Sequence, residues 1–145
     1  MNNGLPQGSV LVPVLFNIYT SDMNTTIVLK FIYADDTVLV TQAKSFGELE
    51  TILNADLKTI QDYFECWMLK SNPHNTISAR FHLNNKQAQT QLDLTFCNTP
   101  IRPEIHPSYL GVQLDRSLTY RPHLKDTAAK VRTRVNLISR LAGIT

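Results

Sequence analysis

The stretch Phe31-Ile32-Tyr33-Ala34-Asp35-Asp36-Thr37-Val38-Leu39-Val40 decides the fold of this chain. Two runs rich in β-branched and aromatic residues, 28–33 and 37–41, enclose a short polar turn, and this pattern predicts a β-hairpin. Its tip holds two adjacent carboxylates, Asp35 and Asp36, whose like charges repel unless a cation neutralises them. Carboxylate oxygens are hard ligands that suit Mg²⁺. The hairpin is therefore a candidate metal site, although aspartate is also common in ordinary turns.

The clearest helix in the sequence follows the hairpin, over residues 45–70. Ser45 and Glu48 have the spacing of a capping box at its start. Apolar side chains from Phe46 to Met68 then recur at helical intervals and form one stripe. We expect this stripe to pack under the sheet that contains the hairpin, and we assign it no ligand.

The remaining segments predict an α+β fold. A turn-rich loop leads into a helix over residues 11–23, with Ser9 as its cap and Pro13 in its first turn. Alternating apolar residues predict strands over residues 77–83, 92–96 and 109–114, and a last helix begins at about Leu124. This order of elements predicts a largely antiparallel sheet packed on helices.

Length and composition narrow the class of protein. A chain of 145 residues that is 43% hydrophobic and 18% charged suits one folded domain. The longest apolar run, residues 10–16, is too short to span a membrane, and no secretory signal is visible. Cys66 and Cys97 have no partner cysteine at metal-binding or redox spacing, and this pattern indicates an intracellular protein.

Charge is distributed unevenly along the chain. Residues 116–145 carry seven basic side chains and one acidic side chain, whereas the other 115 residues have a net charge of −4. A basic tail beside an acidic body suggests a segment that contacts phosphates and a body that holds cations. A solvated helix face gives the same charge pattern, so charge alone does not decide between them.

Two motifs together resemble those of reverse transcriptases. Gly4-Leu5-Pro6-Gln7-Gly8-Ser9-Val10-Leu11 is similar to the family's Pro-Gln-Gly loop, which opens the helix under the templating base. Tyr33-Ala34-Asp35-Asp36 is similar to the aromatic-x-Asp-Asp hairpin of the polymerase palm. Each motif is weak alone, but both occur in the family's order and at a plausible spacing.

The resemblance extends over essentially the whole chain. Residues 67–73 resemble the lead-in to the next palm motif, and residues 109–115 resemble the hairpin that grips the primer terminus. Residues 117–124 and the basic helix after them resemble the start of the thumb in jockey-like elements. The chain is thus identified as a fragment of a non-LTR (LINE-type) retrotransposon reverse transcriptase. This implies a partial palm, an antiparallel sheet packed on helices, over residues 1–115, and a basic helical start of the thumb over residues 116–145.

The activity implied by this resemblance is RNA-directed DNA polymerisation, a nucleotidyl transfer. The partners are an RNA template, a DNA primer and a dNTP, with two Mg²⁺ ions, or Mn²⁺ in their place, and no membrane. The resemblance implies that catalysis and metal binding fall to Asp35 and Asp36. Contacts with the template and the nucleotide are implied for Pro6, Gln7, Gly8, Tyr33 and Ala34, and the primer grip for Tyr109, Leu110 and Gly111. The residues implied to follow the nucleic-acid backbone are Lys125, Lys130, Arg132 and Arg134.

The sequence departs from the family pattern in two places. Asn75 stands where the family has a lysine proposed to protonate the leaving pyrophosphate, and an amide cannot act as an acid. His74 and Lys70 are the alternatives for that role. The family's other palm aspartate lies on a strand before the Pro-Gln-Gly loop, ahead of Met1. We therefore expect this chain alone not to polymerise DNA.

Two other functions compete with a polymerase fragment. A catalytically dead retroelement remnant would at most bind nucleic acid through its basic tail. A nucleotide cyclase also places paired carboxylates on a palm-like hairpin, but it needs a glycine-rich nucleotide loop there, and this hairpin has none.

Overall fold

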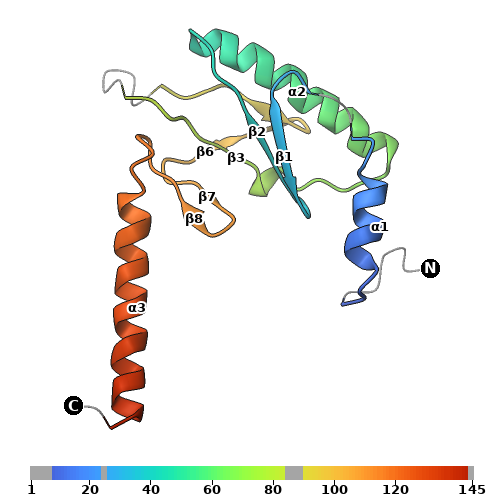
Figure 1. The fold of residues 1–145 in the computed structure, drawn as a ribbon. Coiled ribbons are helices and arrows are strands. Elements are labelled where there is room, and N and C mark those ends of the chain that lie inside the picture. Colours follow the sequence, from blue (N-terminus) through green and yellow to red (C-terminus); the bar gives the residue numbers. More distant parts are fainter. Residues whose placement is uncertain (1–7, 24–25, 84–89, 144–145) are drawn as a thin grey trace. The chain divides into compact units, whose positions relative to one another are not determined.

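The computed structural model describes residues 8–23, 26–83 and 90–143, and the chain divides into two compact units (Figure 1). The first unit comprises Met1–Thr76 and Leu92–Ile101, and the second comprises Ile77–Gln91 and Arg102–Thr145. This division does not follow the boundary expected at residue 115, and the assignment of residues 1–115 and 116–145 to palm and thumb stays a prediction. None of the helices in the described ranges has the length and apolar content needed to cross a bilayer.

The first unit confirms the predicted hairpin and the long helix. Its elements, in chain order, are α1 (Val12–Tyr19), β1 (Leu29–Tyr33), β2 (Asp36–Val40), α2 (Phe46–Cys66), the short 3-10 helix η1 (Pro73–Asn75), β4 (Thr95–Phe96) and β5 (Thr99–Pro100).

Helix α1 begins with Pro13 in its first turn, as predicted, but it is shorter than the expected helix. It ends at Tyr19 rather than at residue 23, and the hydroxyl groups of Thr20 and Ser21 donate hydrogen bonds back to its last carbonyls. The predicted cap at Ser9 is wrong, because Leu11 is the N-cap residue. The Ser9 side chain instead accepts a hydrogen bond from the amide of Leu11 at 3.4 Å, in the turn before the helix.

Helix α2 begins at the predicted Ser45 cap, although Glu48 reaches back to the residue before the cap rather than to Ser45 itself. The Ser45 hydroxyl accepts a hydrogen bond from the amide of Glu48 at 3.3 Å, and the Glu48 carboxylate accepts one from the amide of Lys44. The helix ends at Cys66, four residues before the predicted end. Met68 adopts a left-handed backbone with φ 54°, and the amides of Met68 and Leu69 donate back to the carbonyls of Glu65 and Phe64. This is a Schellman motif, which usually has glycine in the left-handed position.

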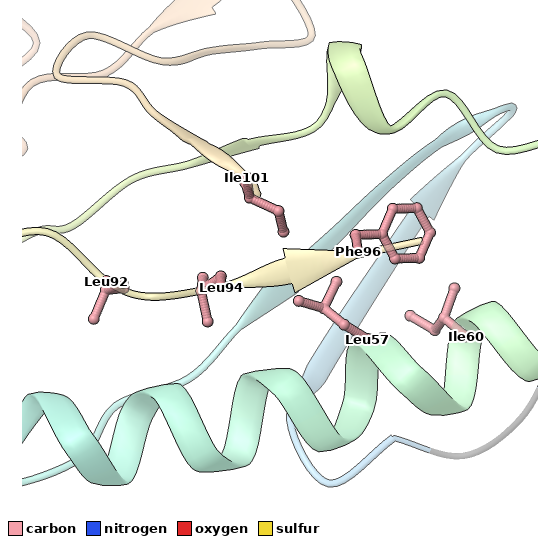
Figure 2. Close-up of a cluster of buried hydrophobic side chains, with 6 residues drawn as sticks. All are labelled: Leu57, Ile60, Leu92, Leu94, Phe96 and Ile101. Carbon is pink, nitrogen blue, oxygen red and sulfur yellow. The ribbon is translucent and has the colours of Figure 1, made fainter. Parts of the chain in front are cut away.

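The core of the first unit lies between α2 and the segment that leads through β4 (Figure 2). Leu57 and Ile60 of α2 pack against four side chains from residues 92–101, and Leu39 of β2 packs on the same cluster. The core position of the predicted stripe is confirmed for Phe46, Leu49, Leu53, Leu57, Ile60 and Phe64, but these side chains pack mainly against residues 92–101, and among the described hairpin residues only Leu39 joins this cluster. The last two members of the stripe are not core residues, because Trp67 and Met68 lie beyond the helix end and are 39% and 91% exposed. The buried members of the cluster are Leu57, Ile60, Leu92, Leu94, Phe96 and Ile101.

Polar side chains of α2 hold the segment before and through β4. The carboxylate of Glu50 and the amide oxygens of Asn54 and Gln61 accept hydrogen bonds from successive odd-numbered residues of this segment. Such bonds satisfy the free N–H groups that a neighbouring strand would otherwise pair. Helix α2 therefore occupies the place of a strand along this edge. The bonds run from Asp93 N to Glu50 Oε1 (2.8 Å), Thr95 N to Asn54 Oδ1 (3.0 Å) and Cys97 N to Gln61 Oε1 (3.1 Å).

The second unit contains short strands and one long helix. The expectation of one strand over residues 109–114 is wrong, because this segment forms a tight hairpin, the shape that the resemblance implies here. Leu110 and Gly111 both adopt positive φ, 48° and 81°, which reverses the chain between two strands of two residues each. The elements are β3 (Ile77–Ser78), β6 (Arg102–Pro103), β7 (Ser108–Tyr109), β8 (Val112–Gln113) and α3 (Arg121–Leu141).

The fold is a mixed α+β fold, but the expected continuous sheet is not observed in the described residues. Strands pair in four separate two-stranded ladders, three antiparallel and one parallel between β3 and β6. The predicted strand over residues 77–83 is reduced to Ile77–Ser78, which pairs with Arg102–Pro103. The apolar residues that alternate over residues 92–96 are buried, as predicted. However, side chains of α2 accept hydrogen bonds from amides of this segment, and only Thr95–Phe96 pairs with another strand.

Candidate functional site

The two adjacent aspartates lie at the tip of the β1–β2 hairpin, as the sequence predicts. The register pairs Tyr33 with Asp36, which leaves Ala34 and Asp35 as a two-residue turn. Turns of this length need a positive φ at the first central position, and Ala34 has φ 51°. The small alanine methyl group keeps this strained conformation accessible, whereas a β-branched side chain would not.

The two carboxylates at the hairpin tip could supply some, but not all, of the ligands of a bound cation. Asp35 and Asp36 are exposed, and within the described residues neither carboxylate takes part in a hydrogen bond or an ion pair. Their oxygens are hard donors that fit Mg²⁺ or Mn²⁺. Among residues 8–23, 26–83 and 90–143, no group of three or more His, Cys, Asp or Glu side chains is arranged to hold a metal ion. The pair therefore supplies ligands from one turn only.

The hairpin is attached to α2 at the root of β1, through a residue that the sequence analysis did not single out. Asp56 of α2 is 2% exposed, and its carboxylate accepts hydrogen bonds from the amides of Ile27 and Val28 at 2.9 and 2.8 Å. An acid in the middle of an apolar helical stripe was the signal that could have identified it. The anchor and the Leu39 contact together join the hairpin to the core.

Helix α1, which follows the Pro-Gln-Gly loop, is attached to the C-terminal end of the same helix. The Tyr19 hydroxyl donates to the carbonyl of Trp67 at 2.6 Å, and the two rings meet edge to face at 5.3 Å. The buried Tyr63 hydroxyl donates to Asp22 Oδ1 at 2.8 Å. Burial, and then the hydrogen bond to Asp22, raise the pKa of Tyr63 to about 12. Thus α2 fixes both the hairpin and the helix that the loop precedes.

The loop itself is described only from its last glycine. Gly8 has φ 86°, a conformation in which a side chain would be strained. Pro6 and Gln7 lie outside the described residues. Their expected contacts with template and nucleotide stay predictions.

In the second unit, the β7–β8 hairpin and α3 line a shallow pocket of about 240 Å³. The pocket brings together two predicted nucleic-acid residues, Gly111 of the hairpin turn and Lys130 of the helix. His123, which the sequence analysis did not assign, joins the two elements, because its Nδ1 accepts a hydrogen bond from the amide of Gln113 at 3.3 Å. The lining residues are Ser108, Gly111, Gln113, His123, Asp126, Thr127 and Lys130.

The other predicted primer and backbone residues lie outside this pocket. Tyr109 is half-buried and Leu110 is exposed in the hairpin. Lys125, Arg132 and Arg134 are exposed on α3, and in the part of the chain that the structure describes none of them forms an ion pair. These cations are available to an anionic partner.

Asp115 fixes the turn that leads into α3. Its Oδ1 accepts a hydrogen bond from the amide of Tyr120 at 2.7 Å, and its Oδ2 accepts one from the Thr119 hydroxyl at 3.0 Å. Desolvation raises the pKa of Asp115, but hydrogen bonds from Thr119, Tyr120 and Ser117 outweigh it and lower that pKa below 3.8. The ionised carboxylate therefore stabilises the start of the basic helix.

Comparison with known proteins agrees with these motifs. Residues 1–114 match the family model described as reverse transcriptase (RNA-dependent DNA polymerase). The chain is 32% identical to the probable RNA-directed DNA polymerase from transposon BS of Drosophila melanogaster, over 93% of this chain and 16% of that protein. It is 33% identical to the RNA-directed DNA polymerase from mobile element jockey of the same species, over 94% of this chain and 16% of that protein.

The similarity covers nearly all of this chain but only a small part of each relative. A further relative, the probable RNA-directed DNA polymerase from transposon X-element of Drosophila melanogaster, is 25% identical over 91% of the chain and 15% of its own length. No solved structure matches the chain. The family match over 114 residues and the relatives together confirm the resemblance read from the two motifs, and the chain belongs to the reverse transcriptase (RNA-dependent DNA polymerase) family, as a fragment of the non-LTR retrotransposon type.

Proposed function

We propose that this chain contributes part of the palm and the start of the thumb to an intracellular RNA-directed DNA polymerase. One observation carries the proposal: Asp35 and Asp36 lie together at an exposed hairpin tip, with no internal partner in the described residues. The chain spans about a sixth of the length of the curated relatives, so the activity is proposed for the protein that contains all the required segments.

In this proposal, Asp35 and Asp36 hold the divalent ions of the polymerase, two Mg²⁺ ions or Mn²⁺ in their place. When bound, such ions neutralise charge on the attacking hydroxyl and on the departing pyrophosphate. Both carboxylates lie at one turn of a paired hairpin, so the positions of both depend on the same two-stranded ladder. Other segments must complete the ligand sets.

The residues around the carboxylates set the space for the nucleotide and the primer end. The methyl group of Ala34 is the only side chain between Tyr33 and Asp35, so a primer terminus can approach the turn closely. Tyr33 presents its ring on the same face of the hairpin as Asp36, because the two residues are paired across the strands. With Pro6, Gln7 and Gly8, these residues contact the RNA template and the incoming dNTP.

The second unit provides the contacts to the primer strand. Gly111 and Lys130 line one pocket, where the ammonium group can pair with a phosphate while the glycine leaves room for the backbone. Tyr109 and Leu110 support the primer beside this pocket. The exposed Lys125, Arg132 and Arg134 follow the nucleic-acid backbone along α3 without reading sequence.

One observation favours the second candidate, a catalytically dead remnant that binds nucleic acid. Asn75 stands in η1 at the position of the family's acid lysine, and both it and the neighbouring His74 are exposed. His74 or Lys70 would have to supply the proton if the enzyme is active. The two candidates differ in whether the chain supports primer extension.

A chimera tests the proposal directly. The segment of the Drosophila melanogaster jockey polymerase that aligns with this chain is replaced by residues 1–145, and primer extension is measured on an RNA template. We expect extension, and a loss of at least about 10²–10³ in rate for Asp35→Asn or Asp36→Asn. Asp62→Asn, which removes an exposed carboxylate from α2, is the matched control.

The outcomes separate the candidates. Extension that persists unchanged in Asp35→Asn contradicts the catalytic assignment of the hairpin. A folded chimera that binds an RNA–DNA hybrid but extends no primer, and that recovers extension on Asn75→Lys, identifies this chain as the remnant.

A further inference from the structure

A buried carboxylate lies at the base of the hairpin that carries Asp35 and Asp36. Asp56 is the one buried charged side chain in the described part of the chain. Each of its oxygens accepts a hydrogen bond from a different backbone amide, Oδ1 from Ile27 at 2.9 Å and Oδ2 from Val28 at 2.8 Å. These two residues immediately precede β1, so the carboxylate binds the backbone at the point where the hairpin begins.

The surroundings of Asp56 compensate its charge. Lys30, the second residue of β1, attracts the carboxylate electrostatically, and its ammonium group also donates to the carbonyl of Met23 at 3.2 Å. Burial of an ionised carboxylate is costly unless it is fully paired. The next positions on the same helix, Leu57 and Ile60, are apolar members of the core. An apolar residue at position 56 would avoid the cost of burial but could not bind the two amides.

The hairpin needs such an attachment. A two-stranded ladder by itself is marginally stable in water, and β1 and β2 pair only with each other in the described residues. Four of the five residues of β1 are exposed, and Leu39 is the hairpin residue that packs on the core cluster. The contact of Leu39 with the cluster does not by itself fix the direction in which the ladder points, whereas hydrogen bonds from two successive amides to one carboxylate fix the root of the strand.

We propose that Asp56 is a positioning residue for the Asp35–Asp36 pair. It fixes the start of β1 on α2, and because β1 and β2 are paired along their whole length, the direction of β1 determines where the two carboxylates lie. From Val28 to the turn the strand extends roughly 20 Å, so a small rotation at the root displaces the carboxylates by a larger amount. The inference rests on the proposed function for what the tip binds, and on the structure alone for how the hairpin is held.

The test compares local opening of the hairpin with opening of the core in the same chain. Amide hydrogen exchange is followed by NMR in the wild type, in Asp56→Asn and in Asp62→Asn. Asparagine keeps the shape but offers one acceptor oxygen to two amides. We expect the cross-strand amides of β1 and β2 to lose about tenfold to a hundredfold in protection, with a much smaller change at Leu57 and Ile60. Asp62→Asn removes the same charge from the exposed side of α2 and should change neither set.

A second readout reports the tip itself. At a temperature where each variant is folded, a Mn²⁺ titration measures paramagnetic broadening of the amides around Asp35 and Asp36. We expect Asp56→Asn to weaken Mn²⁺ affinity at the tip and Asp62→Asn to leave it unchanged. Equal losses of protection in the hairpin and the core, with Mn²⁺ affinity at the tip unchanged, would show that Asp56 only stabilises the fold and would overturn the inference.

A second variant keeps the test decisive if Asp56→Asn does not fold. Replacing Ile27 by its α-hydroxy acid analogue turns one of the two N–H groups into an ester oxygen, and the Ile27 side chain is 75% exposed. Selective loss of hairpin protection in this variant supports the inference, and wild-type protection contradicts it. Absence of Mn²⁺ broadening at the wild-type tip counts against the proposed function, whereas the exchange comparison still decides the role of Asp56.

Discussion

The Tyr63 hydroxyl donates a 2.8 Å hydrogen bond to Asp22 Oδ1, and this bond joins α2 to the turn that follows α1. The same hydroxyl lies 3.3 Å from the carbonyl of Tyr19, whose own side chain contacts Trp67. Three aromatic residues therefore hold α1 on the C-terminal part of α2. Helix α1 and the Asp-Asp hairpin are therefore both attached to α2.

This contact predicts a specific dependence of stability on pH. The folded pKa of Tyr63 is raised from 10.0 to about 12, so the folded state holds this proton more tightly than the unfolded state. The stabilisation is fully present below pH 10 and is lost as pH rises from 10 to about 12. Tyr63→Phe removes the hydrogen bond, which should cost about 1 kcal/mol at neutral pH.

Urea denaturation of the wild type and of Tyr63→Phe across this pH range measures the effect. We expect the difference in unfolding free energy between the two proteins to shrink as pH rises. A constant difference would mean that Tyr63 does not titrate with the raised pKa.

The end of α2 predicts a stabilising substitution. Met68 is 91% exposed and adopts φ 54° at the left-handed position of the Schellman motif. A left-handed backbone costs a residue with a side chain roughly 1–2 kcal/mol, and glycine avoids most of that cost while losing more entropy on folding. Met68→Gly should therefore raise the free energy of unfolding by up to about 1 kcal/mol. Thermal unfolding measures it, with Met68→Ala as the control that should change little; destabilisation by glycine would contradict the motif.

The basic helix predicts a change in the salt dependence of nucleic-acid binding. Replacing Lys130, Arg132 and Arg134 with Gln should weaken binding to an RNA–DNA hybrid, because each lost phosphate contact lowers the slope of log affinity against log salt by about one unit. Titrations at several salt concentrations measure the slope. A matched control replaces three other exposed cations, and an equal loss of slope in it would mean that net charge alone drives binding. The control residues are Lys44, Lys58 and Arg102.

Local sequence signals were sufficient for the parts of the fold that depend on nearby residues. The hairpin follows from its β-forming flanks and the two-residue turn, and the start of α2 follows from Ser45 and Glu48. The end of α2 was predicted too late because the left-handed position is occupied by Met68 rather than by glycine. Alternation correctly placed Leu92, Leu94 and Phe96 inside.

The remaining differences arise from contacts between segments distant in sequence. No local pattern shows that Glu50, Asn54 and Gln61 of α2 satisfy the strand edge over residues 93–97, so the extent of the sheet was overestimated. The role of Asp56 likewise depends on two amides 28 and 29 residues away. The motif residues of the site were found by resemblance, but the residues that hold them in place became visible only in the structure.

The central claim is that the Asp35–Asp36 pair binds the divalent ions of a polymerase, and a residue-resolved Mn²⁺ titration of the chain tests it most directly. We predict that the amides of residues 34–37 broaden at the lowest Mn²⁺ concentration, that Mg²⁺ reverses the effect, and that the Asp35→Asn, Asp36→Asn double variant abolishes it. Broadening that begins elsewhere, at Asp62 or Glu104 for example, or that is unchanged in the double variant, would contradict the account.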